Sequence, residues 1–263
     1  MIFCSVTLFL LLSCTDGERN NPFDPHGASN PVSSWIVAGN TLTDPDGNTY
    51  TTVTIGTQTW TVENLRTTKF NDGTSIPHVS DSIEWSGLYS TTSPGYCFYN
   101  NSTSALERVK WGALYNWYAI NTGKLAPEGW RVPSEEDWLI LENYLIASGY
   151  NYDGSNSGNK IGKSLAAKTD WESSSSSGAG AIGNDLSSNN RSGFSALPCG
   201  YRLLRGDRCY FYAQGSSCTW WSSSEYDSLR ASTRGLIYID NSLENYSLSG
   251  YKFEGKSVRL VRD

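Results

Sequence analysis

The chain has 263 residues, with 20 basic and 26 acidic side chains and a formal net charge of −6. This charge excludes the strongly basic surface of nucleic-acid-binding proteins, so we expect no nucleic-acid partner. Aromatic residues make up 13% of the sequence and charged residues 17%, which indicates a globular, aromatic-rich domain and excludes an intrinsically disordered chain. The sequence contains two histidines, so we expect neither a histidine-based metal site nor a cofactor.

The N-terminal segment is typical of an exported lipoprotein. Residues 6–12 form an apolar run that is too short to span a membrane, and Ser13 and Cys14 follow it as in a lipobox. We therefore predict a signal peptide over residues 1–13, lipidation of Cys14 and a flexible tether over residues 14–39. The expected location is the cell envelope, at the outer membrane or cell surface, with the lipid anchor contacting the membrane. An ordinary secretory signal is the alternative.

The folded part begins at residue 40 with short β-strands. The sequence DPDGN at residues 44–48 predicts a turn, because proline fixes φ and the Asp-Gly pair accepts positive φ. It joins a strand at residues 41–42 to one at residues 50–55, and a second turn at Gly56 leads into a strand at residues 59–62. The same run resembles the start of a calcium loop, but the glutamate that closes such loops is missing.

Two helices are predicted in the middle of the chain. Apolar residues at nearly helical spacing predict the first over residues 111–121. The second begins after Ser134, which can cap its free amides, and carries Glu135, Glu136 and Asp137 at the positive end of the helix dipole. These three acids are thereby explained without catalysis.

The second half of the chain is predicted to be rich in strands. A short helix is expected within residues 159–168, and a long loop rich in serine and glycine over residues 172–190. Short β-type segments then follow at residues 200–204, 209–213, 219–222, 236–239 and 257–261. Because helices and strands are segregated unevenly along the chain, the fold class is predicted to be α+β.

Four cysteines remain beyond the predicted leader and lipidation site: Cys97, Cys199, Cys209 and Cys218. An even number in an exported protein favours two disulfides, for which three pairings are possible. Cys209 and Cys218 flank an alternating segment that predicts a hairpin, so we expect them to pair, which leaves Cys97 with Cys199 by elimination. A zinc site is disfavoured because no C-x₂-C pair is present.

Nine blocks of sequence, in order over residues 40–263, resemble one family. They are DGNTY at 46–50, IGTQTW at 55–60, ENL at 63–65, FNDG at 70–73, GALYNWYA at 112–119, GWRVPS at 129–134, GFSALP at 193–198, WWSSSE at 220–225 and SVRLVRD at 257–263. Together they are similar to the Fibrobacter succinogenes major paralogous domain. The tether sequence NPFDP at residues 21–25 is similar to exported lipoproteins that carry this domain.

The resemblance implies a C-type lectin-like fold, with short twisted antiparallel strands, two main helices and long loops, over residues 40–263. The stretch WRVPSEEDW at residues 130–138 is similar to the strand-to-helix stretch of the formylglycine-generating enzyme relatives in that superfold. Many members of the family carry cysteine where this chain has Ala126 and Leu260. The loss of both suggests a bridge that apolar packing replaces here. Fold similarity alone assigns no function.

The sequence contains no complete catalytic constellation, so we assign no catalytic residue. Sugar-binding lectins of this superfold usually use calcium motifs that are missing here, which leaves stacking on aromatic faces. The predicted ligand-binding residues are Trp221, Tyr210, Tyr212, Trp85 and Glu225, with a core position as the alternative for the rings. For Glu225 the alternative is an ion pair with Arg234 or Arg259. Core positions are expected for Trp60, Trp130 and Trp138.

Two functional hypotheses follow. The first is a non-catalytic lipoprotein whose lectin-like domain binds a polysaccharide or a surface protein, as in adhesion. The alternative is an enzyme related to formylglycine-generating oxidases that acts on an exported protein. In that enzyme Cys209 and Cys218 would supply the thiols.

Overall fold

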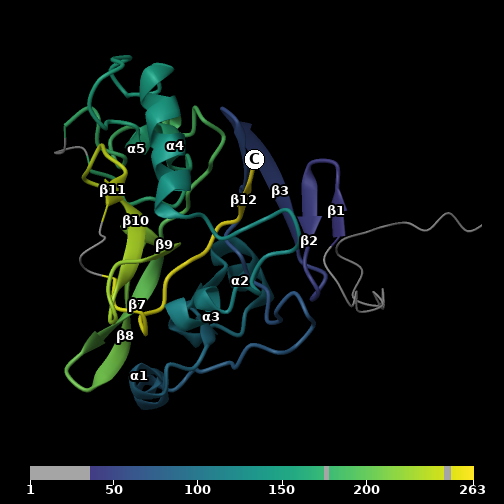
Figure 1. Cartoon of the computed structure of the whole chain (residues 1–263). Helices are drawn as coiled ribbons and strands as arrows, with labels where there is room; N and C mark the ends of the chain where they lie inside the picture. The colour runs from purple at the N-terminus through teal and green to yellow at the C-terminus, as the bar shows by residue number, and fades with distance from the viewer. Residues whose placement is uncertain (1–35, 175–177, 246–249) are drawn as a thin grey trace, which may run out of the picture. The chain divides into compact units, whose positions relative to one another are not determined.

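A computed structural model describes residues 36–174, 178–245 and 250–263 (Figure 1). The chain divides into Met1–Asn30, which lies outside the described residues, and the unit Pro31–Asp263. The predicted signal peptide, Cys14 and most of the predicted tether therefore also lie outside the described residues. Within the described part, no helix has both the length and the apolar character that crossing a membrane requires.

The first sheet is an antiparallel sheet of five strands in the order β1-β2-β3-β4-β12. Its strands are β1 (Ile36–Ala38), β2 (Thr41–Thr43), β3 (Thr49–Ile55), β4 (Gln58–Thr61) and β12 (Val261–Arg262). The turn between β2 and β3 is held by Asp44, whose buried carboxylate accepts hydrogen bonds from the backbone amides of Asp46 and Asn48, both at 2.9 Å, and from the Tyr50 hydroxyl at 2.5 Å. The prediction of a turn at residues 44–48 is confirmed.

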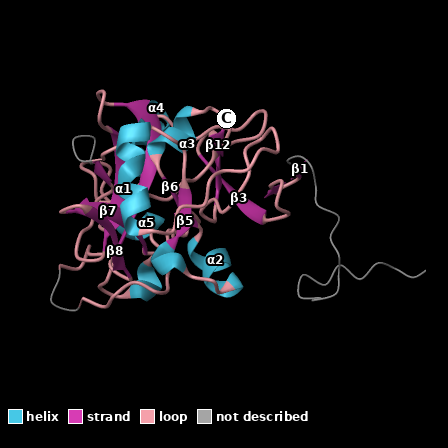
Figure 2. Ribbon diagram, turned by 90° about the horizontal axis from the view of Figure 1, so that it is seen from below, coloured by secondary structure: helices cyan, strands magenta, loops and turns pink. Residues whose placement is uncertain are grey.

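The second sheet also has five strands, in the order β11-β10-β9-β7-β8. Its strands are β7 (Cys199–Arg205), β8 (Arg208–Gln214), β9 (Ser217–Glu225), β10 (Ala231–Ile237) and β11 (Glu244–Asn245). β7 and β9 are parallel, whereas the other neighbours are antiparallel. In Figures 1 and 2 the two five-stranded sheets lie on opposite sides of the unit, and Figure 2 shows the two-stranded sheet of β5 (Tyr96–Phe98) and β6 (Ala113–Tyr115) between them.

The helices are short, except for α4. They are α1 (Ser82–Thr91), α2 (Ala105–Trp111), α3 (Trp117–Asn121), α4 (Glu135–Ala147) and α5 (Gly162–Leu165). The prediction of one helix over residues 111–121 is wrong in its first half. α2 ends at Trp111 and is followed by Gly112, whose φ of 78° is a conformation that glycine adopts readily. Residues 113–115 then form β6, which pairs with β5. Helix α1, whose N-cap is Asp81, was not predicted from the sequence. The sheet-rich mixture of helices and strands agrees with an α+β class.

Helix α4 begins where the sequence predicts and contains a reciprocal cap. The Ser134 hydroxyl accepts from the amide of Asp137 at 3.1 Å, and the Asp137 carboxylate accepts from the amide of Ser134 at 2.8 Å. The Arg131 guanidinium donates to both oxygens of the same carboxylate, at 3.0 and 2.5 Å. Burial of the carboxyl group opposes ionisation, but these hydrogen bonds outweigh it and lower the pKa of Asp137 below 3.8.

We expect Asp137→Asn to lower the free energy of unfolding by about 2 kcal/mol at pH 7, because it removes the cap and the paired charge together. A carboxylate with a depressed folded-state pKa stabilises the fold above its unfolded pKa and loses that contribution as the pH falls through the folded-state value. The difference between wild type and variant should therefore shrink as the pH is lowered from about 4 toward the folded-state pKa. Urea unfolding across this range measures it, with the exposed Glu136→Gln as the control. Equal losses in both variants would contradict the prediction.

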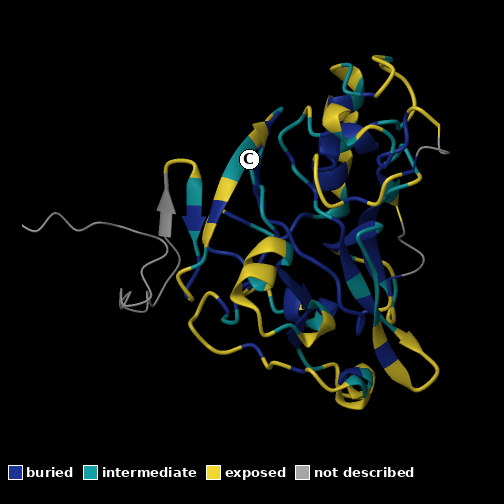
Figure 3. Ribbon diagram, turned by 180° about the vertical axis from the view of Figure 1, so that it is seen from behind, coloured by how far each residue is buried: buried dark blue, intermediate teal, exposed yellow. Residues whose placement is uncertain are grey.

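Large rings fill the interior between α4 and the second sheet. Figure 3 shows that much of the second sheet is buried. Trp60, Trp138, Phe194 and Trp220 are fully buried, and five pairs of these rings have centroids 4.8 to 6.1 Å apart. This confirms the core positions predicted for Trp60 and Trp138, and Trp130 is also buried. Ala126 and Leu260 are buried in one apolar cluster, which agrees with apolar packing at that place.

Candidate functional site

Two of the predicted ligand-binding rings belong to the core. Trp85 and Trp221 are each 0% exposed, and their indole N–H groups donate to the carbonyl oxygens of Phe253 and Tyr115, at 2.7 and 2.8 Å. Neither ring presents a face to solvent. The prediction that they stack on a ligand is therefore wrong, because the domain uses their volume to fill its interior.

Glu225 lies at the exposed end of β9, where it forms an ion pair with Lys252. The expected alternative partners are engaged elsewhere. Arg234 bonds Glu135 at 2.5 Å and Glu142 at 3.0 Å, and Arg259 bonds uncharged oxygen atoms. The first-turn acid Glu135 therefore has a structural role, as the sequence predicted.

The predicted disulfides are not formed, because the four described cysteines are buried free thiols. The predicted hairpin closed by Cys209 and Cys218 does not exist either, since β8 pairs with β7 and not with β9. Cys209 lies opposite Leu204 and Cys218 opposite Gly200. Those two positions on β7 are roughly 13 Å apart at about 3.3 Å per residue, and a disulfide tolerates a Cα separation of about 7 Å.

Cys97 and Cys199 are also separated, because they belong to different apolar clusters. Cys97 packs in the same cluster as Cys209, and Cys199 in the same cluster as Cys218. The pairing by elimination is thus corrected as well. The oxidase hypothesis required Cys209 and Cys218 to lie side by side, and they do not.

We expect the four described thiols to be unreactive in the folded protein. Burial raises the pKa of Cys97 and of Cys209 to about 11, and burial also raises the pKa of Cys199 and Cys218. At pH 8, a chain carrying Cys4→Ser and Cys14→Ser should show no rapid reaction with an aromatic disulfide reagent, and four equivalents after unfolding in guanidinium. Rapid titration of one or more thiols in the native protein would contradict this.

Tyr210 and Tyr212 lie on one face of the second sheet. In the register of β7 and β8, Tyr212 is opposite Tyr201 and Tyr210 is opposite Leu203, so all four side chains point to the same side. The rings of Tyr201 and Tyr212 are stacked, with centroids 6.4 Å apart and planes at 30°. Tyr210 is 46% exposed, and Tyr201 and Tyr212 are half-buried. The sheet therefore carries a ledge of phenol rings, which we call the tyrosine ledge (Tyr201, Tyr210 and Tyr212).

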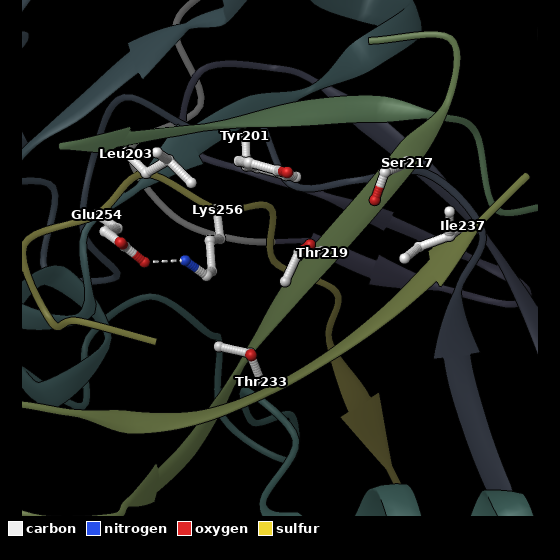
Figure 4. A pocket seen from close by; sticks show the side chains of 8 residues that line it. All are labelled: Tyr201, Leu203, Ser217, Thr219, Thr233, Ile237, Glu254 and Lys256. Carbon is white, nitrogen blue, oxygen red and sulfur yellow. Dashed lines mark hydrogen bonds and ion pairs between the residues drawn. The ribbon is translucent and has the colours of Figure 1, made fainter. Parts of the chain in front are cut away.

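A pocket opens beside this ledge because the parallel strands β7 and β9 separate. They pair at Gly200 and Cys218, and further along the segment of residues 255–257 lies between them. Gly255 exchanges backbone hydrogen bonds with Arg202 on β7, at 2.8 and 2.7 Å. Ser257 donates to the carbonyl of Thr219 on β9 at 3.1 Å. The side chain of Lys256, between them, points into the pocket (Figure 4).

This ledge pocket has a volume of about 310 Å³. Its lining residues come from three strands and the inserted segment: Tyr201, Leu203, Ser217, Thr219, Thr233, Ile237, Glu254 and Lys256 (Figure 4). Four of the eight carry hydroxyl groups, and the two apolar side chains lie toward opposite ends. The lining thus combines hydroxyl groups with apolar surface, as small-molecule sites do.

One ion pair lies in the ledge pocket. Lys256 and Glu254 are bonded to each other, and their side chains are 7% and 9% exposed. The Lys256 ammonium also lies 4.8 Å from the ring centroid of Trp221. Burial, and then the negative charge of Glu254, raise the pKa of Tyr201 above 10.0, so its phenol stays a neutral hydrogen-bond donor. The pair supplies one carboxylate and one ammonium group, with no net charge, to a ligand.

Three important residues of the pocket were not predicted from the sequence: Tyr201, Glu254 and Lys256. For Tyr201 a signal existed, because alternation along residues 200–204 places it on the same face as Leu203. For Glu254 and Lys256 no local signal exists, since their segment reaches the pocket only by lying between strands that are distant in sequence. Among the described residues, no group of three or more His, Cys, Asp or Glu side chains could hold a metal ion.

Residues 53–262 match the family described as Fibrobacter succinogenes major domain. The chain belongs to this family. The match includes both five-stranded sheets apart from β1, β2 and the first four residues of β3. It also includes the whole lining of the ledge pocket, so the pocket is part of this Fibrobacter succinogenes major domain. Among curated proteins and among solved structures, no match to the chain is found.

Proposed function

We propose that this protein is a non-catalytic, envelope-anchored lipoprotein whose C-type lectin-like domain binds a glycan in the ledge pocket. The observation that carries the proposal is the stacked pair Tyr201 and Tyr212 beside a pocket rich in hydroxyl groups. Aromatic rings bind the apolar face of a pyranose, and hydroxyl and carboxylate groups bind its hydroxyls. A volume of about 310 Å³ suits one or two sugar units.

Charge favours a neutral glycan over a polyanion. The protein carries a net charge of −6, and the ion pair in the pocket adds no net charge. This net charge would oppose the approach of a polyanionic chain at low salt. Neutral polysaccharides of an envelope or a cell wall are therefore the ligands we test first.

A glycan array probed with the full chain, followed by calorimetry on the strongest neutral glycan, tests the binding proposal. Tyr201→Ala and Tyr212→Ala should each weaken binding about tenfold, which corresponds to about 1.4 kcal/mol of lost ring contact. The control is Tyr152→Ala, because Tyr152 is 41% exposed and does not line the ledge pocket. Its affinity should stay within twofold of wild type. No glycan binding, or equal losses in all three variants, would overturn the proposal.

Lipid anchoring is tested separately in cells. A culture that expresses the full chain is labelled with a radioactive fatty acid and then fractionated. The wild type should carry the label and sediment with membranes, because two or three acyl chains anchor a protein stably. Cys14→Ser should lose the label and leave the membrane fraction. A wild type that carries no label would overturn the anchor, without affecting the glycan proposal.

A further inference from the structure

A further pocket, of about 360 Å³, opens where the end of β4, the end of α2 and the segment that follows α5 come together. Its lining includes Glu63 after β4, Lys110 on α2, Lys168 after α5, and Ser195 and Arg259 from later segments. All of its described lining residues differ from those of the ledge pocket, so the two pockets are separate sites. We call it the arginine pocket.

Three of the sequence blocks by which the chain resembles its family meet at the arginine pocket. They are ENL at 63–65, GFSALP at 193–198 and SVRLVRD at 257–263. Backbone pairing holds the first and the last together, because the amide of Leu65 donates to the carbonyl of Val258 at 2.8 Å. These three blocks contribute no lining residue to the ledge pocket, so glycan binding there does not account for them.

Two positive charges at the arginine pocket form no ion pair within the part of the chain that the structure describes. The guanidinium of Arg259, 1% exposed, bonds uncharged oxygen atoms, and the exposed Lys168 has no acidic neighbour within ion-pair distance. Burial lowers the pKa of Arg259 to about 10, so it is charged at neutral pH even though burial opposes that charge. A bound anion would offset this desolvation cost.

The pocket also offers hydrogen-bond donors that point to an anion. Nη2 of Arg259 carries two N–H groups, of which one donates to the carbonyl of Ser195 at 3.3 Å, and the other has no partner among the described residues. The Ser195 hydroxyl accepts from the side-chain amide of Asn190 at 2.5 Å, which leaves its own hydrogen available to donate. The Ser195 amide donates back to Asn190 at 2.9 Å, so this donor is fixed in place.

The charge balance of the arginine pocket favours a ligand with one negative charge. Lys110 is neutralised by Asp170, at 2.5 Å. Glu63 also lines the pocket, and its carboxylate accepts from the backbone amide of Thr51 at 2.7 Å and from the Thr51 hydroxyl at 2.9 Å. Two cations without an ion pair and this one carboxylate leave a net charge of +1. A dianion such as a phosphate ester would therefore be opposed by Glu63.

From these contacts we infer that the arginine pocket binds the carboxylate of a single hexuronate sugar. The guanidinium of Arg259, the ammonium of Lys168 and the hydroxyl of Ser195 supply charge-assisted hydrogen bonds to the carboxylate. Glu63 oxygens retain lone pairs that accept sugar hydroxyls, and a volume of about 360 Å³ suits one pyranose ring. The net charge of −6 opposes a polyuronate chain, which is why the ligand is one uronate residue.

The test measures, by calorimetry on the full chain at low salt, the binding of methyl glucuronide. Methyl glucoside is the matched ligand, because it carries a hydroxymethyl group in place of the carboxylate. We expect the glucuronide to bind about tenfold more tightly than the glucoside, and about fivefold more tightly than glucose 6-phosphate. Tyr201→Ala, which alters the ledge pocket, should leave glucuronide binding within twofold of wild type.

Variants of the arginine pocket then assign the site. Lys168→Gln should weaken glucuronide binding about tenfold and Ser195→Ala about fivefold, because each removes one donor to the carboxylate. The control is Arg205→Gln, which removes the same charge from an exposed position outside the pocket and should change the affinity less than twofold. Glu63→Gln should strengthen the binding of glucose 6-phosphate about fivefold, since it removes the opposing charge.

Three results would overturn the inference, and none of them bears on glycan binding in the ledge pocket. The first is equal affinity for the glucuronide and the glucoside in the Tyr201→Ala variant. The second is a loss in Arg205→Gln as large as that in Lys168→Gln, which would show a general charge effect. The third is a uronate trimer that binds more tightly than the monosaccharide, which would contradict a site for one residue.

Discussion

Replacing Trp220 by alanine is expected to lower the free energy of unfolding by about 4 kcal/mol, the largest effect of a single ring in this domain. Trp220 is fully buried, and its ring lies 5.8 Å from Trp138 and 5.7 Å from Phe194. Its indole N–H also donates to the side-chain oxygen of Asn64 at 2.9 Å. The substitution leaves a cavity between a helix and a sheet, and it removes a buried hydrogen bond.

Urea unfolding followed by circular dichroism measures this loss. The matched control is Trp111→Ala, since Trp111 is half-buried at the edge of the same cluster, and its loss should be less than half as large. If Trp220→Ala lowered the free energy of unfolding no more than this control does, the buried ring cluster would not be a main source of stability.

The second large effect is expected at Arg259, whose buried guanidinium forms no ion pair with any acidic residue that the structure describes. It donates to the side chain of Asn64 at 3.2 Å and to the carbonyl oxygens of Thr61, Phe194 and Ser195 at 3.0, 2.5 and 3.3 Å. Arg259→Met should lower the free energy of unfolding by about 3–5 kcal/mol, because several buried acceptors lose their donor together.

Arg259→Lys should rescue little of this loss, since one ammonium group cannot replace a planar fork that reaches separate acceptors. The exposed Arg205→Met serves as the control and should change stability by less than about 0.5 kcal/mol. Because Trp220 and Arg259 both bond the same oxygen of Asn64, we expect the double variant to lose less than the sum of the single losses. A loss under 1 kcal/mol for Arg259→Met would contradict this account of the buried cation.

Local sequence patterns predicted some of the rings at the candidate site correctly and others wrongly. Alternation along β8 is visible in the sequence, and it correctly places Tyr210 and Tyr212 on one face of a sheet. The sequence also predicted Trp85 and Trp221 as ligand-binding rings, but both rings are buried. Composition identifies a domain rich in rings, but which rings fill the interior depends on the elements that cover them.

The sequence by itself determined the features that depend on neighbours in the chain: the turn held by Asp44, the reciprocal cap of α4, most strands of the second sheet and the family. Tertiary structure alone decided the features that depend on pairing between distant segments. It placed β7 between β8 and β9, which separates Cys209 from Cys218, and it brought Glu254 and Lys256 to the ledge pocket. The physical reason is that backbone periodicity and capping act over a few residues. Strand order and burial instead depend on how the whole chain packs.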